Sequence, residues 1–129
     1  KTRKEKPFYF RAAAELHLNQ LLRVRPYNFL SWFENYNLGI KTAEEKKLAS
    51  EYRQNYNVKF GNWAIDRIIH WENEVYPPDI IHIHGSKDHI LPVRYLKPTY
   101  LIDGGGHMMI MNKSEEISKI ISGELKRIK

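Results

Sequence analysis

Two short apolar runs, each ending near glycine, constrain the fold of this chain more than any other feature. The first, residues 80–84, is followed by a Gly-Ser-Lys turn and then by Asp88. The second, residues 100–102, leads through one acidic residue into the glycines 104–106 and then His107. Short runs rich in β-branched residues and bounded by turn residues indicate buried strands. We therefore predict two strands that end in turns, one presenting Asp88 and the other His107.

Helical patterns fill the first 76 residues. A helix is predicted from Phe8 to about Leu22, directly after a proline. A second helix is predicted after Pro26, with Gly39 as its C-terminal stop. The residues expected on the apolar faces of these two helices are Leu18, Leu21 and Leu22 in the first and Phe29, Leu30 and Phe33 in the second.

Two further helices are predicted before residue 77. Thr42 and Glu45 have the spacing of a capping box, in which each side chain bonds the backbone N–H of the other residue. The stripe of the helix that they open is narrow, Leu48, Tyr52 and Tyr56, so one side should stay in contact with water. The strongest helical period of the chain follows and ends at a Pro-Pro pair; its apolar positions are Phe60, Ala64, Ile68, Trp71 and Val75.

From residue 77 the pattern changes to strand. Strands are predicted at Asp79–His84 and Thr99–Ile102, both buried on two faces as in a parallel sheet. A brief helix or turn through Tyr95 would connect them. Asn112, with Glu115 three positions later, is expected to cap a final helix. The apolar face expected for that helix is Ile117, Ile120, Ile121, Leu125 and Ile128. The predicted fold class is α/β, mainly helical with a short parallel strand pair.

The composition narrows the class of protein. The 129 residues are 42% hydrophobic, enough for one domain or part of one. The absence of cysteine excludes a disulfide scaffold and thiolate chemistry and fits a reducing, cytoplasmic compartment. No apolar run approaches the roughly 18 residues of a membrane span, so we expect no membrane partner. The net charge is +6, but its basic residues are scattered along the chain, which indicates a solvated surface rather than a nucleic-acid site.

Asp88 and His107 are the candidate catalytic residues. Taken alone, Asp88 is typical of a turn and His107 of a surface or core histidine beside a glycine turn. Because the ends of neighbouring parallel strands meet at one edge of a sheet, we expect the two side chains to touch. A carboxylate that orients a histidine forms two thirds of a nucleophile–His–Asp relay.

The segments that carry these residues resemble those of α/β-hydrolases. Residues 84–92 match the H-G-x-x-D-x-x-x-P segment, which carries the triad acid, and residues 104–107 match the G-G-x-H segment, which carries the triad histidine. The resemblance implies that Asp88 and His107 are the catalytic acid and histidine. It implies that residues 1–76 are a helical lid or cap and that residues 77–129 hold the last two strands and the C-terminal helix of the hydrolase core. No cofactor is implied.

The chain departs from this family in lacking a nucleophile. No serine lies in a Gly-x-Ser-x-Gly elbow, and the oxyanion-hole loop is likewise missing. The short interval between Asp88 and His107 also leaves little room for a connecting helix. We therefore expect a fragment of an esterase-like serine hydrolase that is inactive alone and acts on a small acyl substrate only in the full-length protein. Its uncovered strands would favour self-association of the fragment.

Two other functions fit parts of the sequence. His82, His84 and Asp88, with His89 and His107 nearby, resemble the H-x-H-x-D-H motif of metallo-β-lactamase-like zinc hydrolases, with two extra residues before the aspartate. A basic, aromatic-bearing binding module without catalysis is the other alternative. The distance from the Asp88 carboxylate to His107 separates the relay from the binding module, because only a relay requires that contact. Metal analysis of the purified protein separates the zinc alternative.

Overall fold

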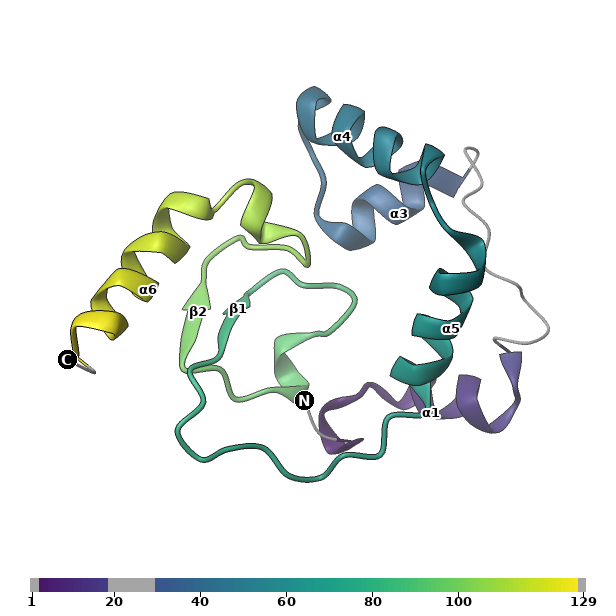
Figure 1. The fold of residues 1–129 in the computed structure, drawn as a ribbon, viewed down its shortest axis with the longest axis horizontal. Coiled ribbons are helices and arrows are strands. Elements are labelled where there is room, and N and C mark those ends of the chain that lie inside the picture. Colours follow the sequence, from purple (N-terminus) through teal and green to yellow (C-terminus); the bar gives the residue numbers. More distant parts are fainter. Residues whose placement is uncertain (1–2, 19–29, 128–129) are drawn as a thin grey trace.

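The computed structural model describes residues 3–18 and 30–127 of the chain (Figure 1). The positions predicted at Leu21, Leu22, Pro26, Phe29 and Ile128 lie outside the described residues. The helices and strands are α1 (Phe8–Glu15), α3 (Ser31–Leu38), α4 (Ala43–Gln54), α5 (Val58–Ile69), β1 (Ile83–Gly85), β2 (Tyr100–Ile102) and α6 (Ser114–Arg127). Short 3-10 turns occur at η1 (Arg3–Glu5), η3 (Val93–Tyr95) and η4 (Met109–Met111).

The fold is mostly helical with a two-stranded parallel sheet, which confirms the predicted α/β class. Ile83 pairs with Tyr100 and Gly85 with Ile102, so the two strands end side by side. Both strands are shorter than predicted. β1 begins at Ile83, since Asp79 lies in a turn that precedes it, and β2 begins at Tyr100. The connection between them holds only the three-residue η3, in agreement with the predicted brief turn.

The sheet lies between α6 and the group formed by the other helices (Figure 1). Helix α6 lies on the side of β2, where the Tyr100 hydroxyl donates a hydrogen bond to Glu124. Helices α1, α3, α4 and α5 lie on the opposite side of the sheet. The described residues contain few buried apolar side chains, and these are Ile40, Ala49, Ile69, Leu96 and Ile102. Nor do they contain a helix whose length and apolarity suffice to cross a lipid bilayer.

Helix α1 is shorter than predicted and α3 ends where predicted. The expected helix to Leu22 is wrong, because α1 ends at Glu15 and His17 adopts a φ of 50° that no helix continues. Helix α3 ends at Gly39, whose φ of 76° places it in the left-handed region. Glycine reaches that region without strain, and the residue is thus the predicted C-terminal stop.

The predicted capping box of α4 is present. The Glu45 backbone N–H donates to Thr42 Oγ1 at 3.1 Å, and Glu45 Oε2 accepts from the Thr42 N–H at 2.9 Å. The predicted apolar stripe is not the buried face, however. Leu48 and Tyr52 are exposed, whereas Glu45 and Ala49 are buried. The stripe prediction is wrong because the buried side of α4 carries Glu45, which accepts a hydrogen bond from Asn112 in the C-terminal part of the chain.

Removal of the cap should weaken the helix measurably. We expect Thr42→Ala to lower the free energy of unfolding by about 1 kcal/mol, because the N–H of Glu45 loses its side-chain acceptor. Urea denaturation followed by circular dichroism measures the change. Ser118→Ala, at an exposed position of α6, is the matched control. Equal effects of the two substitutions would show that the cap contributes nothing.

Helix α5 is shorter than predicted and rotated relative to the predicted face. It ends at Ile69 instead of reaching Val75. Phe60 and Ile68 are exposed, whereas Gly61 and Ile69 are buried. The small Gly61 allows the Tyr56 ring to pack directly against the helix backbone. At the other end the buried Lys6 ammonium donates to the Ile69 carbonyl at 2.7 Å, a favourable place for a cation.

The last helix begins two residues later than its predicted cap. Helix α6 starts at Ser114, and the Asn112 amide instead donates to Glu45 Oε1 at 2.8 Å. The capping prediction is therefore wrong, because Asn112 is engaged with a residue of α4. Ile117 and Ile120 are half-buried on the inner side of α6, while Ile121 and Leu125 remain exposed.

Candidate functional site

Asp88 lies at the centre of a network of hydrogen bonds just beyond β1. Its carboxylate Oδ1 accepts from the backbone N–H groups of Ile90 at 2.9 Å and Leu91 at 2.8 Å. Its Oδ2 lies 2.9 Å from Nδ1 of His107. The residue is 6% exposed, so these groups replace water around the carboxylate. The contact between Asp88 and His107 predicted from the sequence is present.

These contacts determine the charge state of Asp88. Burial by itself raises the pKa of the carboxyl group, but hydrogen bonds from His107 and the Leu91 N–H, together with the nearby histidine rings, outweigh it. The pKa of Asp88 therefore lies below the ordinary carboxyl value of 3.8. At neutral pH Asp88 is a carboxylate that can only accept hydrogen bonds.

The carboxylate determines which nitrogen of His107 carries the proton. Because ionised Asp88 has no proton to donate, the short contact requires a proton on Nδ1 of His107. In the neutral imidazole, Nε2 is then left with its lone pair. The His107 side chain is 33% exposed, against 4% for Asp88. The arrangement is that of an oriented base, with a buried carboxylate on one nitrogen and a lone pair on the other.

Glycines allow the two strand ends to approach each other. A Cβ atom on Gly85 would lie 2.3 Å from the carbonyl oxygen of Gly105, closer than real Cβ atoms approach. The Lys87 N–H donates to that same oxygen at 2.8 Å, which joins the turn of Asp88 to the turn of His107. Glycine at these positions therefore brings the two catalytic candidates within hydrogen-bond distance.

The C-terminal end of α3 supports the His107 turn from the other side. A Cβ on Gly39 would lie 2.8 Å from the Cα of Gly106. The next peptide also binds there, because the Met108 N–H donates to the Leu38 carbonyl at 2.9 Å. His107 is thus flanked by two backbone attachments to α3. This support could not be inferred from the hydrophobic pattern of the sequence.

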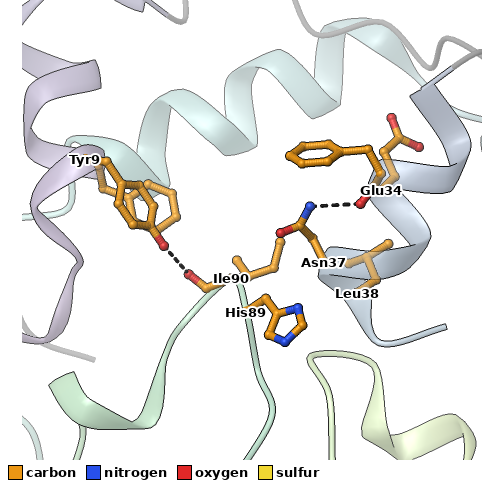
Figure 2. A pocket seen from close by; sticks show the side chains of 8 residues that line it. Tyr9, Glu34, Asn37, Leu38, His89 and Ile90 are labelled. Atoms are coloured by element: carbon orange, nitrogen blue, oxygen red, sulfur yellow. Dashed lines mark hydrogen bonds between the residues drawn. The ribbon is translucent and has the colours of Figure 1, made fainter.

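An apolar cavity of about 420 Å³ lies beside the turn that follows Asp88 (Figure 2). Its volume is within the range of small-molecule pockets. The Tyr9 hydroxyl closes one wall by donating to the Ile90 carbonyl at 3.2 Å, and the Asn37 amide lies on another. The lining residues come from α1, α3 and the Asp88 turn: Tyr9, Phe10, Phe33, Glu34, Asn37, Leu38, His89 and Ile90. No local sequence pattern predicts this cavity, because its walls come from segments far apart in the chain.

The histidines around Asp88 do not form a metal site in the structure. The rings of His82 and His84 are 5.3 Å apart, but Nε2 of His84 is 2.8 Å from the carbonyl oxygen of Leu91. Within residues 3–18 and 30–127, no three His, Asp or Glu side chains are placed to hold a metal ion. The zinc alternative therefore finds no ligand set among the described residues.

Ser86, two residues before Asp88, joins the two turns at the strand ends. Ser86 Oγ donates to Asp103 Oδ1 at 3.2 Å and accepts from the Gly104 N–H at 2.8 Å. Both bonds hold the turns at the strand ends together. The Ser86 hydroxyl is thus engaged by Asp103 and Gly104.

We compared the chain with known protein families, curated proteins and solved structures. No family model, no curated protein and no solved structure matches it.

Proposed function

We propose that this chain supplies the acid and the histidine of an α/β-hydrolase-type serine hydrolase that cleaves acyl esters. The 2.9 Å contact between Asp88 Oδ2 and His107 Nδ1 is the single observation that carries the proposal. A binding module without catalysis has no need for a buried carboxylate that fixes a half-exposed imidazole. The G-x-x-D and G-G-x-H contexts of the two residues support the same family.

The proposed reaction uses His107 as a base and then as an acid. Nε2 takes the proton of a serine hydroxyl, supplied by a segment outside this chain, while the serine oxygen attacks the ester carbonyl. The imidazolium returns the proton to the leaving alcohol, and a water molecule then repeats the sequence to release the acid. Asp88 stays ionised throughout and stabilises the imidazolium.

The proposed substrate is a small molecule with an apolar acyl group. The cavity beside Ile90 is walled mainly by aromatic and aliphatic side chains, and its 420 Å³ suit such a group. His89 and Ile90, from the turn that follows Asp88, form one wall, so the cavity adjoins the segment that carries the proposed acid. The proposed mechanism needs no cofactor, nucleic acid or membrane, and the lack of cysteine fits a cytoplasmic enzyme.

The experiment compares this chain with a protein that includes its natural upstream coding sequence. We expect the 129-residue chain to leave 4-nitrophenyl esters intact and to resist labelling by a serine-reactive fluorophosphonate. The longer protein should hydrolyse the esters and be labelled at one serine in a Gly-x-Ser-x-Gly turn.

The histidine provides the matched control. His107→Ala in the longer protein should abolish turnover, whereas His70→Ala, which changes an exposed histidine at the end of α5, away from both the relay and the cavity lining, should leave turnover unchanged. Stoichiometric labelling of any serine within residues 1–129 would contradict the proposal. So would full activity of the His107 variant.

A further inference from the structure

A second histidine contacts the turn that carries Asp88. His84 lies on β1 and is 6% exposed. Its Nε2 is 2.8 Å from the carbonyl oxygen of Leu91 and 3.6 Å from Oδ2 of Asp88. The oxygen that binds His107 therefore has a second imidazole on its buried side.

The partner of His84 determines its tautomer. A carbonyl oxygen can only accept a hydrogen bond, so Nε2 of His84 must carry a proton. His107 has the opposite arrangement, with its proton on Nδ1. The two histidines around one carboxylate therefore differ in the nitrogen that donates.

The bonds of Leu91 close a ring around the turn. Its backbone N–H donates to Asp88 Oδ1, and its carbonyl accepts from His84. The turn of residues 88–91 is thus held through both backbone polar groups of Leu91, by the carboxylate within the turn and by a side chain of the preceding strand. Removal of the His84 donor would release the Leu91 carbonyl and, with it, one restraint on the carboxylate.

We infer that His84 is a positioning residue for the Asp88–His107 pair. It holds the Asp88 carboxylate in the orientation that keeps the proton of His107 on Nδ1 and the lone pair on Nε2. The inference rests on the proposed function, since this tautomer matters only if His107 serves as a base. His84 itself touches no substrate and exchanges no proton in the reaction.

Two amide substitutions of His84 show whether the hydrogen-bond donor at the place of Nε2 matters, or only the volume of the side chain. The amide nitrogen of glutamine can reach the place of Nε2, whereas that of asparagine stops near Nδ1. We expect His84→Gln to preserve the pair and His84→Asn to disturb it. His84→Leu removes every polar atom and tests packing without a donor.

The measurement is the tautomer of each histidine in the 129-residue chain, read from the nitrogen shifts in long-range ¹H–¹⁵N spectra. In the unsubstituted chain we expect the Nε2–H form for His84 and the Nδ1–H form for His107. In the Asn and Leu variants, solvent exchange of the His107 Nδ1 proton should rise about tenfold, the effect of losing roughly one hydrogen bond, while Gln restores the original rate. Thermal melts establish that each variant is folded.

The outcomes separate this inference from the proposed function. A folded Leu variant with unchanged His107 exchange would overturn the positioning role, as would an Nδ1–H tautomer of His84 in the unsubstituted chain, which needs no variant to fold. Asp88→Ala, which removes both carboxylate oxygens, tests the pair itself. If His107 keeps its Nδ1–H form in that variant, Asp88 does not orient it and the proposed function fails, whatever His84 does.

Discussion

Replacing Asp88 with alanine is expected to lower the free energy of unfolding at neutral pH by about 3 kcal/mol. The substitution leaves the N–H groups of Ile90 and Leu91 without their acceptor and removes the partner of His107. Urea denaturation at pH 7 measures the loss. Asp79→Asn, in an exposed turn before β1, is the control and should change the stability little. A loss as small as that of the control would show that the carboxylate does not hold the turn.

The same carboxylate should make the fold sensitive to acid. The pKa of Asp88 is lower in the folded chain than the ordinary value of 3.8, because its hydrogen bonds outweigh the effect of burial. The unfolded state therefore binds the proton more readily. The stabilisation is present above pH 3.8 and is lost as the pH falls through the folded pKa. Asp88→Asn should flatten this part of the pH–stability curve, whereas Asp79→Asn should leave it unchanged.

Self-association is the second large effect that we expect. We propose that copies of the isolated chain associate through the exposed apolar surface around Ile80 and Leu101 at the sheet and through the face of α5 that carries Phe60. Ile80 and Leu101 are each 51% exposed at the sheet, and Phe60 is 64% exposed on α5. Apolar surface of this extent beside a two-stranded sheet with free edges favours contact with another copy. Light scattering over a dilution series should give a mass above 15.4 kDa that falls on dilution.

A charged residue in place of the exposed Leu101 tests this mode of association. Leu101→Lys should shift the chain toward the monomer, because a lysine in the contact would lose its water. Leu125→Lys is the matched control, since Leu125 is also exposed but lies on α6. A chain that stays at 15.4 kDa at every concentration would show that its helices close the core unaided.

The features that the sequence predicted correctly depend on neighbouring residues. The stop at Gly39 and the capping box of Thr42 and Glu45 are formed within a few positions of the chain. The contact between Asp88 and His107 is long in sequence, but it follows from two strand ends that a parallel sheet must bring together. The position of the candidate site was therefore accessible from local signals and one rule of sheet geometry.

The features that were missed depend on partners that no local pattern reveals. The buried face of α5 is set by Tyr56 against Gly61 and by Lys6 at the helix end. Asn112 does not cap α6 as predicted, because its amide donates to Glu45, a residue 67 positions away in the sequence. The cavity wall provided by α1 and α3 arises in the same way. Each of these choices is made by tertiary packing, which overrides helical periodicity.

The close approach of Gly39 to Gly106 has a consequence for the proposed boundary at residue 76 between a helical lid and the hydrolase core. With the Leu38–Met108 hydrogen bond, it makes the end of α3 and the histidine turn one mechanical unit. If residues 1–76 act as the proposed lid, a movement that keeps these contacts would bend the chain before Leu38. A chimera that exchanges the helical part of the chain at residue 76 would replace this support along with the cover. To keep the histidine turn seated, an exchanged cover must retain a glycine in place of Gly39 and the carbonyl that precedes it.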